Sequence, residues 1–460
     1  MDALTALANR FGDAVSVAAS VRDHHAQGVT AHATRPPDAV LFARSTEDVV
    51  DAVRICREQN CPIVPFGTGT STEGQISAEQ GGLTINLSQM DNILRVSAAD
   101  MDCTVQAGVT RKALNASLRD TGLFFPIDPG ADASIGGMAS TRASGTNAVR
   151  YGTMRDVVMS LKVVLPNGDV IETGTRARKS SAGYDLTRLF VGAEGTLGII
   201  TEVTLRLSPV PDRMSAAVAS FPTVADAVST VVSVIQSAIP IARAELLDAL
   251  QVAACNRYSK TDLPEQPTLF LEFHGSEQHV GEQVEQFLAI ARDHGGSDLR
   301  WASAAEERSR LWQARHDVWW ATLALRPGSR GVPTDICVPI SELPAVIAAT
   351  ERDVNDLGLI APLCGHVGDG NFHLCVLLDP DDPDEVGRVA ELNRRMITRA
   401  LDVDGTCTGE HGIGTGKIPY LVQERGAGMT VLAAIKRAID PRNIMNPGKI
   451  LSVESFPPLA

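Results

Sequence analysis

The chain has 460 residues, of which 44% are hydrophobic and 21% are charged, an ordinary globular composition with room for two or three domains. Its 41 lysines and arginines stand against 55 aspartates and glutamates, and the charge of −14 argues against nucleic acid or an anionic membrane surface as partner. Eight scattered cysteines without a CxxC pair argue against a disulfide framework and against a cysteine-bound metal.

The targeting signals in the sequence are weak. The N-terminal stretch MDALTALANRFGDAV lacks a basic region followed by an apolar one and is not rich in arginine, so neither a signal peptide nor a transit peptide is expected. No apolar run approaches the ~18 residues that a transmembrane helix needs. We therefore expect a cytoplasmic protein without a transmembrane segment, with a peripheral position at the inner membrane left open.

The first half of the chain has the pattern of short strands separated by turns. Ser45 is placed to cap a helix that follows the first strand, and Pro166-Asn167-Gly168 is a hairpin turn. The expected strands are Ala39–Ala43, Pro62–Phe66, Leu83–Leu87, Leu94–Val96, Thr104–Ala107, Leu161–Leu165, Val170–Glu172 and Ile199–Leu207.

A change of composition after Pro209-Val210-Pro211 predicts a domain boundary near residue 211. Beyond it we expect a strand at Thr268–Phe273, one long amphipathic helix over Leu299–Leu325, and a final helix from about Met429 to Asp440. The mixed order of elements predicts an α+β fold. The predicted domains are 1–211, 212–428 and a C-terminal segment, 429–460.

Three glycine-rich segments border predicted strands. They are Pro65 to Gly74 (PFGTGTSTEG), Ile127 to Gly152, and Gly192 to Ile200 (GAEGTLGII). Glycine lets backbone N–H groups approach an anion closely, and Ser and Thr add hydroxyl donors, as a diphosphate requires. The common nucleotide-binding motifs are not met, so turn-rich β structure remains the alternative.

The order and spacing of these segments resemble the FAD-binding domain of the vanillyl-alcohol oxidase superfamily over about residues 35–210. The resemblance implies a two-subdomain FAD-binding fold with a substrate domain and a C-terminal segment that returns to the flavin. It places the pyrophosphate on the first segment, with Pro65, Gly67, Thr68, Gly69, Thr70, Ser71 and Gly74. It places the rest of the FAD along Pro129, Gly130, Ser134, Gly136, Gly137, Ser144, Gly145, Asn147, Tyr151, Glu194, Gly195, Ile200 and Asn446. Since some relatives attach flavin through a histidine of the first segment and residues 61–75 contain none, we expect non-covalent FAD.

Two further motifs carry histidines and a carboxylate among glycines. His366 and His373 flank a turn in GHVGDGNFH, and Glu410 and His411 lie in GTCTGEHGIG. Two histidines and one glutamate make a three-ligand site with open positions, the pattern of a catalytic metal. The alternative is that these histidines are structural.

These two motifs resemble the C-terminal domain of the D-lactate dehydrogenase, glycolate oxidase and D-2-hydroxyglutarate dehydrogenase group. The resemblance implies that His366, His373 and Glu410 bind a divalent metal and that His411 is the catalytic base. Imidazole ligands suit zinc, and manganese or iron is also compatible.

A candidate carboxylate clamp lies in the predicted helix. Trp312, Arg315 and Trp319 fall on one helical face, where Arg315 could bind a substrate carboxylate or merely cover apolar surface. Relatives carry an arginine here, which favours the clamp. Trp319 and Trp320 suggest an apolar pocket, and Pro333-Thr334 stand where diacid-specific relatives tend to have a lysine. Both features favour a monocarboxylate.

The sequence therefore predicts FAD-dependent oxidation of a small D-2-hydroxy acid, such as D-lactate, to the 2-oxo acid with metal assistance. The acceptor of the electrons (quinone, cytochrome or electron-transfer flavoprotein) and a homodimer are left open. The alternatives are a D-2-hydroxyglutarate dehydrogenase, a glycolate oxidase flavoprotein subunit, an ether-lipid synthase of related fold and a non-catalytic accessory subunit.

Overall fold

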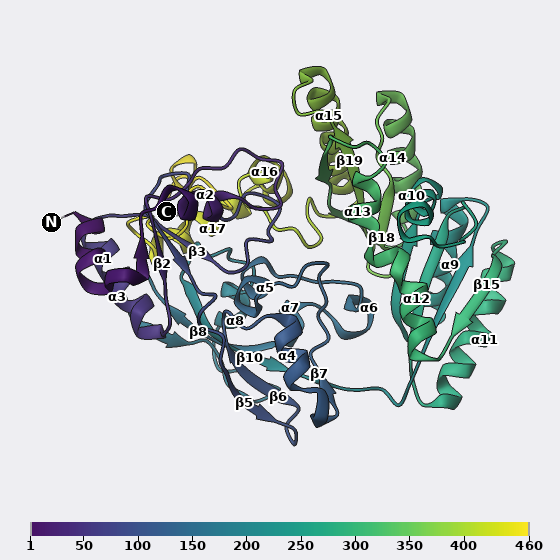
Figure 1. Ribbon diagram of the computed structural model, residues 1–460, viewed down its shortest axis with the longest axis horizontal. Helices are drawn as coiled ribbons and strands as arrows, with labels where there is room; N and C mark the ends of the chain where they lie inside the picture. Colours follow the sequence, from purple (N-terminus) through teal and green to yellow (C-terminus); the bar gives the residue numbers. More distant parts are fainter. Residues whose placement is uncertain (1, 459–460) are drawn as a thin grey trace. The chain divides into compact units, whose positions relative to one another are not determined.

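The protein, described here by a computed structural model over residues 2–458, folds into two compact units (Figure 1). Unit 1 comprises Met1–Ser144, Gly152–Val210 and Glu410–Ala460, and unit 2 comprises Gly145–Tyr151 and Pro211–Gly409. A short part of the second glycine-rich segment, Gly145–Tyr151, therefore belongs to unit 2, although the residues on either side of it belong to unit 1. The mixture of sheets and helices in each unit confirms the predicted α+β class.

Unit 1 begins with a four-stranded sheet in the order β1-β2-β4-β3. Its strands are β1 (Val15–Ser16), β2 (Ala39–Phe42), β4 (Leu83–Asn86) and β3 (Ile63–Phe66). β4 runs parallel to both β2 and β3. Helix α3 (Thr46–Glu58) connects β2 to β3, and the Ser45 hydroxyl accepts from the Asp48 backbone N–H at 3.1 Å, as its capping pattern predicts. Helices α1 (Ala3–Phe11) and α2 (Ala19–Ala26) precede β2.

The second sheet of unit 1 is antiparallel, with the order β5-β6-β10-β8-β9. Its strands are β5 (Ile93–Ser97), β6 (Asp102–Gln106), β10 (Ile199–Arg206), β8 (Val158–Val164) and β9 (Val170–Glu172). The predicted hairpin joins β8 to β9. β7 (Leu123–Phe124) and β11 (Ser208–Pro209) form a separate pair. The helices around these strands are α4 (Arg111–Ser117), α5 (Ile135–Thr141), α7 (Met154–Val157) and α8 (Leu186–Phe190).

The C-terminal stretch packs back onto unit 1. It contains α16 (Ile418–Arg425) and α17 (Gly428–Ile439), and Met445 pairs with Ile63 at the edge of β3. Lys436 of α17 is buried, and its Nζ donates to the carbonyls of Thr196 (2.7 Å) and Met445 (2.8 Å) and to Asp440 (2.6 Å). This lysine therefore holds the third glycine-rich segment to the chain end.

Unit 2 is built on an eight-stranded antiparallel sheet, with the path β15-β12-β14-β13-β18-β19-β16 and β17 paired to β19. The strands are β12 (Arg213–Ser220), β13 (Ile241–Leu247), β14 (Thr268–Gly275), β15 (Ser297–Ala302), β16 (Arg330–Pro333), β17 (Ile336–Cys337), β18 (Leu363–His366) and β19 (Asn371–Leu378).

Helices cover this sheet on both faces. On one face, Phe287 of α11 (Glu277–Asp293) packs on Phe273 of β14, with α9 (Val224–Gln236) beside α11. On the other face, Trp312 of α12 (Ala305–His316) packs on Phe270 of β14. The remaining helices are α6 (Ala148–Tyr151), α10 (Ala249–Ser259), α13 (Val318–Leu323), α14 (Leu343–Leu357) and α15 (Pro383–Asp402).

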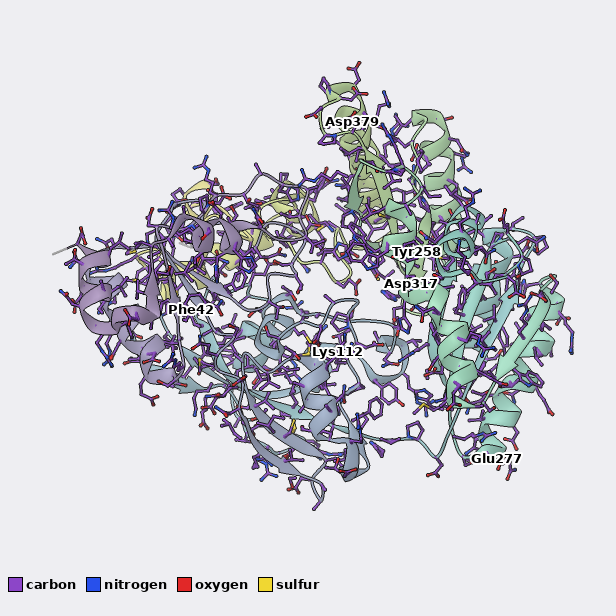
Figure 2. The ribbon with its side chains drawn as sticks, in the orientation of Figure 1. Phe42, Lys112, Tyr258, Glu277, Asp317 and Asp379 are labelled. Atoms are coloured by element: carbon purple, nitrogen blue, oxygen red, sulfur yellow. The ribbon has the colours of Figure 1, made fainter. Side chains whose placement is uncertain are left out.

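The prediction of one helix over Leu299–Leu325 is wrong. Residues 297–302 form the edge strand β15, which pairs with β12, and the helical part breaks between α12 and α13 at Asp317. The Asp317 carboxylate, labelled in Figure 2, accepts from Ser259 Oγ at 2.6 Å and from Gln313 Nε2 at 2.8 Å. The pairing of β15 with β12 and the hydrogen bonds of Asp317 therefore outweigh the helical spacing of the apolar residues in this segment.

Candidate functional site

The first and third glycine-rich segments and most of the second lie together in unit 1. A Cβ at Gly67 would clash with the hydroxyl of Ser134, and a Cβ at Gly195 with the ring of Pro65, so both contacts require glycine. The backbone N–H of Glu194 donates to the Ser140 carbonyl at 2.9 Å. Sequence segments about 60 residues apart therefore form one surface of backbone and small side chains, as the spacing of the motifs suggested.

Hydroxyls of the first segment fit a bound polar group. Among the residues that the structure describes, the buried Ser71 Oγ and Thr72 Oγ1 have no hydrogen-bond partner. The same holds for Oδ1 of Asn446, whose Nδ2 donates to the carbonyls of Gln75 (3.1 Å) and Glu194 (2.7 Å). Since buried polar atoms are nearly always paired in folded proteins, the two hydroxyls fit the oxygens of a diphosphate, and the amide oxygen of Asn446, which can only accept, fits a donor group of FAD.

The other predicted FAD residues of unit 1 differ in exposure. Thr68 and Gly130 are exposed, and the hydroxyls of Thr68 and Thr70 lie 3.3 Å apart. The remaining residues are partly or fully buried; they are Pro65, Gly67, Gly69, Gly74, Pro129, Ser134, Gly136, Gly137, Ser144, Glu194, Gly195 and Ile200. Gly145, Asn147 and Tyr151 belong to unit 2.

Glu194 has a second role that the sequence did not reveal. Its carboxylate accepts from the backbone N–H groups of Ile413 (2.7 Å) and Gly414 (2.8 Å). Complete burial raises the pKa of this carboxyl to about 7, while the two backbone hydrogen bonds oppose the rise. Glu194 thus holds the GEHGIG segment against the third glycine-rich segment.

His411 lies between two carboxylates. Its Nδ1 is 3.9 Å from Glu73 Oε1, and its Nε2 is 4.0 Å from Glu410 Oε1. Burial of Glu73 would raise its pKa, but the hydrogen bond from His32 and the charges of Lys417 and His411 hold that pKa below the usual value. Sequence reasoning missed Glu73, although it is the one acidic residue in the first glycine-rich segment.

His366 and His373 lie on one face of the β18–β19 hairpin. His366 pairs with Asn371 and Cys364 with His373, and directly paired residues of antiparallel strands point to the same face. The two imidazole rings are 5.4 Å apart. Glu410, the residue that directly follows unit 2 in the chain, completes a group whose ligand atoms all lie within 4.8 Å of one another.

Hydrogen bonds fix the tautomers of both histidines. Nδ1 of His373 lies 2.8 Å from the carbonyl oxygen of Thr334, and Nδ1 of His366 lies 2.7 Å from Glu245 Oε1. A carbonyl or carboxylate oxygen can only accept, so Nδ1 carries the hydrogen in each ring, and the lone pair of a neutral ring is on Nε2. This is the form in which imidazole binds a metal, and such partners are typical around metal sites.

Glu245 is a site residue that the sequence analysis missed. It is completely buried, its Oε1 holds His366, and its Oε2 accepts from Nε and Nη2 of Arg315, each at 2.7 Å. Burial would raise the pKa of Glu245, but the charges of His366 and Arg315 keep it below the usual value. The available signal was a lone carboxylate in the apolar strand β13.

Arg315 and the two tryptophans occupy different environments. Arg315 lies in the last turn of α12 and is mostly buried on Glu245. Trp319 lies beyond the break at Asp317 and is partly buried against Gly331 of β16. Trp320 is 59% exposed. Glu245 therefore links Arg315 to His366, whereas Trp320 lies largely in solvent.

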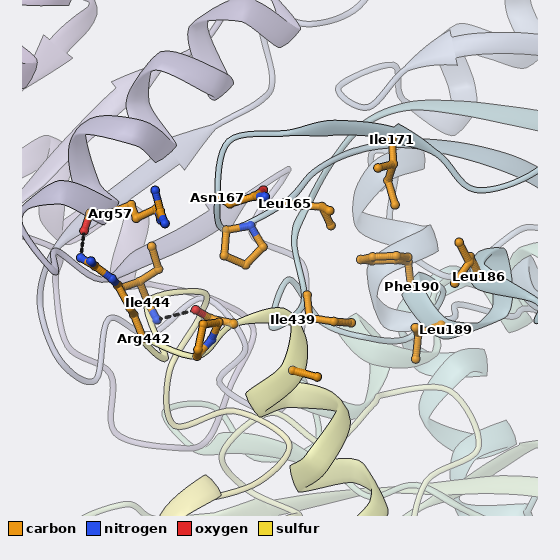
Figure 3. A pocket seen from close by; sticks show the side chains of 14 residues that line it. Arg57, Leu165, Asn167, Ile171, Leu186, Leu189, Phe190, Ile439, Arg442 and Ile444 are labelled. Carbon is orange, nitrogen blue, oxygen red and sulfur yellow. Dashed lines mark hydrogen bonds between the residues drawn. The ribbon is translucent and has the colours of Figure 1, made fainter.

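A cavity of about 440 Å³ in unit 1 is separate from these residues (Figure 3). Its lining is mainly apolar, with Phe190 and Ile439 inside and the backbone turn at Pro166 and Asn167 on one side. Arg442, at its edge, donates to the Arg57 carbonyl at 2.6 Å and to Asn60 Oδ1 at 3.1 Å. No residue predicted to bind FAD, metal or substrate lines it.

Two family models match the chain. The model described as "FAD binding domain" matches residues 37–174, and the one described as "FAD linked oxidases, C-terminal domain" matches residues 210–450. Together they cover the first two glycine-rich segments and both histidine motifs, whereas the third segment, Gly192 to Ile200, lies between the two matched ranges.

Proteins of known name match over nearly the whole chain. "Probable D-lactate dehydrogenase, mitochondrial" of Danio rerio is 53% identical over 445 residues, which are 96% of this chain and 90% of that protein. "D-lactate dehydrogenase [cytochrome], mitochondrial" of Arabidopsis thaliana is 47% identical over 90% of this chain and 73% of its own. "Glycolate oxidase subunit GlcD" of Bacillus subtilis is 35% identical over 91% and 90%.

Solved structures show the same fold at low identity. A 4-ethylphenol oxidase from Gulosibacter chungangensis has a TM-score of 0.78 at 18% identity, with 97% of this chain and 96% of that one covered. A p-cresol methylhydroxylase has a TM-score of 0.77 at 19% identity, with the same coverage. These similarities confirm the predicted two-domain fold of the vanillyl-alcohol oxidase type.

The predicted cytoplasmic localisation is wrong. The four relatives with 38–53% identity are all named as mitochondrial proteins. The prediction rested on composition and on the first residues of the given sequence. Among the described residues, no helix combines the length and the apolar character needed to cross a membrane.

Proposed function

The chain belongs to the family of FAD-linked oxidases, and we propose that it is a dehydrogenase that oxidises D-lactate to the 2-oxo acid with FAD. The observation that carries the proposal is the identity of 40–53%, over at least 90% of this chain, to three proteins named D-lactate dehydrogenase. Glycolate is the second candidate substrate because GlcD proteins match at 30–35% identity. A nicotinamide coenzyme is not part of the proposal.

The glycine-rich segments of unit 1 would hold the FAD, which supplies a flavin ring that accepts hydride from the substrate carbon. The Ser71 and Thr72 hydroxyls would give hydrogen bonds to its polar atoms, and Asn446 Oδ1 would accept one, as these buried and unpartnered oxygens suggest. Without a histidine in residues 61–75, binding would be non-covalent. In domain terms, we propose residues 1–211 as the FAD domain, 212–428 as the substrate domain, and 429–460 as the segment that completes the FAD site.

His366, His373 and Glu410 would bind a divalent metal. Such an ion acts as a Lewis acid and lowers the pKa of a hydroxyl bound to it. We propose zinc, with manganese or iron as the alternatives that elemental analysis would distinguish, because imidazole is a ligand for all three. Two observations support this metal site. Hydrogen bonds fix the tautomers of His366 and His373, and the candidate ligand atoms all lie within 4.8 Å of one another.

Arg315 would bind the substrate carboxylate. Glu245 fixes the guanidinium through two contacts to one carboxylate oxygen, so Arg315 is held in place before substrate arrives. Pro333 and Thr334, at the position where a lysine would serve a second carboxylate, favour a monocarboxylic acid. Trp319 would form the apolar side of the pocket, and Trp320, which is 59% exposed, is not part of the proposal.

His411 would accept the hydroxyl proton. The carboxylates of Glu73 and Glu410, 3.9 Å and 4.0 Å from its two ring nitrogens, would stabilise the positive charge that the ring gains when it takes the proton. Loss of the Cα hydride and of the hydroxyl proton would convert lactate to pyruvate, and the bound FAD would supply the acceptor for the two electrons. We propose a cytochrome as the acceptor that reoxidises it, because the matching plant and yeast enzymes carry that word in their names.

The proposal is tested by steady-state assays of the purified protein with oxidised cytochrome c. D-lactate, L-lactate, glycolate and D-2-hydroxyglutarate are compared as substrates. We expect kcat/KM for D-lactate to exceed the others by at least about tenfold, a difference of about 1.4 kcal/mol in transition-state binding. A preference for glycolate or for the diacid would contradict the substrate assignment, and activity with a quinone but not with cytochrome c would contradict the acceptor.

A further inference from the structure

The C-terminal end of α3 in unit 1 brings two cysteines together, Cys56 in the last turn of the helix and Cys61 just before β3. The helix ends in a Schellman turn. Asn60 has a positive φ of 51°, its N–H donates to the Arg57 carbonyl at 3.4 Å, and the N–H of Cys61 donates to the Cys56 carbonyl at 2.8 Å. In such a turn the side chains at the positions of the two cysteines frequently touch.

The geometry of this turn suits a disulfide. Standard bond lengths added to the 2.8 Å hydrogen bond keep the two Cα atoms within about 7 Å, and the bends along this path make the distance shorter. Disulfides usually join Cα atoms about 4.4–6.8 Å apart. Cys56 belongs to the apolar core that α3 covers, and Cys61 packs against the same core, so the two side chains point into one region.

The two thiols differ in acidity. Cys56 is completely buried, and the hydrogen bond between the thiols, together with this burial, raises its pKa. Cys61 is half-buried, and the hydrogen bond from the Cys56 thiol lowers its pKa, although burial acts in the opposite direction. Because the thiolate is the nucleophile, Cys61 is the thiol of the pair that would react first with an oxidant.

The C-terminal stretch holds this turn in place. Arg442 donates to the Arg57 carbonyl at 2.6 Å, a contact drawn in Figure 3, and to Asn60 Oδ1 at 3.1 Å. Beyond the second cysteine, the N–H of Ile63 donates to the Ile444 carbonyl at 2.7 Å. The backbone is therefore fixed on both sides of that cysteine, and the two thiols stay beside each other in the folded protein.

We propose that Cys56 and Cys61 are a modification site, a dithiol that hydrogen peroxide converts to a disulfide within the folded protein. In the first step the Cys61 thiolate attacks one peroxide oxygen. The S–O bond forms, the O–O bond breaks, and the leaving hydroxide takes up the proton that Cys61 has lost. In the second step the Cys56 sulfur attacks the Cys61 sulfur, the S–S bond forms, the S–O bond breaks, and water leaves with the Cys56 proton. The two thiols lose two electrons, and the peroxide is reduced to two waters. The inference is independent of the proposed function.

The test uses the cleavage sites that flank the first cysteine. The native, reduced protein is exposed to hydrogen peroxide, the remaining thiols are alkylated, and the protein is digested with trypsin without reductant. Trypsin cleaves after Arg54 and Arg57, so Cys56 is released in the tripeptide 55–57, whereas the other cysteine stays in the peptide 58–95. Mass spectrometry should find these two peptides joined, two hydrogens lighter than their sum, and dithiothreitol should separate them.

An internal control and two variants sharpen the result. Burial raises the pKa of Cys337, the other half-buried cysteine, to about 12, so it should react at least about tenfold more slowly than Cys61. Cys56→Ala removes the thiol that closes the bond, so Cys61 should remain a sulfenic acid that a 1,3-diketone traps. Cys61→Ala should leave Cys56 unmodified. The oxidised protein should have a higher thermal midpoint than the reduced one, because the cross-link restricts the unfolded chain.

Several results would overturn the inference. Treated native protein without the joined peptides would show that the two thiols do not close a bond. Equal rates of thiol loss at Cys61 and Cys337 would show that the turn confers no selectivity. Joined peptides that form only after denaturation, or a lower thermal midpoint in the oxidised protein, would show that the folded turn does not suit the cross-link. If Cys56→Ala fails to fold, Cys61→Ala and the unmodified protein decide.

Discussion

Oε1 of Glu245 and Nδ1 of His366 lie 2.7 Å apart, and the opposite oxygen of the same carboxylate holds Arg315. One buried residue of β13 therefore connects a candidate metal ligand to the candidate substrate clamp. A single substitution at this position should disturb two functions that the sequence presents as unrelated motifs.

The first prediction concerns this carboxylate. Glu245→Gln should lower metal affinity by about 10–100-fold, because partners of metal-binding histidines have effects of that size. It should also raise the KM for D-lactate, because Arg315 loses its fixed position. Metal content by elemental analysis and KM are the measurements. Glu385→Gln, which removes the partner of Arg326 elsewhere in unit 2, is the control and should change neither. Full metal occupancy in Glu245→Gln would contradict the assignment.

The second prediction concerns the unpartnered hydroxyls of the first glycine-rich segment. The double change Ser71→Ala and Thr72→Val should weaken FAD binding by about 10–100-fold, since hydrogen bonds to charged groups contribute about 1.5–3 kcal/mol. The apoprotein should be equally or more stable, because two buried groups without partners are removed. FAD titration and thermal unfolding of the apoprotein measure the two effects. Ser117→Ala, whose hydroxyl donates to the Leu114 carbonyl, serves as control. A double variant whose apoprotein is less stable but which binds FAD with unchanged affinity would contradict this prediction.

The third prediction concerns pH. His25 is buried, its Nδ1 lies 2.7 Å from the Val21 carbonyl oxygen, and its Nε2 faces Asn86 Nδ2 at 2.8 Å. Burial lowers its pKa in the folded protein, with the Val21 hydrogen bond acting in the opposite direction. The unfolded chain therefore binds the proton more readily, so stability is lost as the pH falls below the unfolded value of ~6.5. His25→Gln should reduce this pH dependence, measured as the thermal midpoint at about pH 7.5 and pH 5.5. The control His24→Gln, at the exposed neighbouring residue, should show the same pH dependence of the thermal midpoint as the unmodified protein. An unchanged pH dependence in His25→Gln would refute the assignment.

The fourth prediction concerns the C-terminal stretch. Lys436→Met leaves Asp440 buried without its cation and frees the carbonyls of Thr196 and Met445, so it should cost about 3–5 kcal/mol of stability. Because Asn446 directly follows Met445, whose carbonyl Lys436 holds, the affinity for FAD should fall as well. Thermal unfolding and FAD titration measure both changes. A stable Lys436→Met protein that binds FAD normally would show that the return of the chain does not depend on this lysine.

The sequence was informative where a motif is local. The three glycine-rich segments, the hairpin with His366 and His373 and the helix cap at Ser45 all lie where their patterns predicted. Glycine spacing and alternating apolar residues act over short distances, so they can be read from one chain. Arg315 was placed on a helix for the same reason.

The residues that the sequence did not reveal act over long distances. Glu245 meets His366 across 121 positions of the chain, and Glu73 approaches His411 across more than 300. A single carboxylate in an apolar strand has no signature before its partner is known. The misread helix over Leu299–Leu325 has a related cause, because the pairing of β15 with β12 depends on residues more than 70 positions earlier.

The most direct test of the central claim is the anaerobic reduction of the purified protein by D-lactate, followed in the visible absorption band of its flavin. D-lactate should bleach this band and L-lactate should not. Treatment with a chelator should abolish the bleaching, and readdition of a divalent metal should restore it. A colourless protein, or a yellow one whose flavin D-lactate does not reduce, would contradict the account.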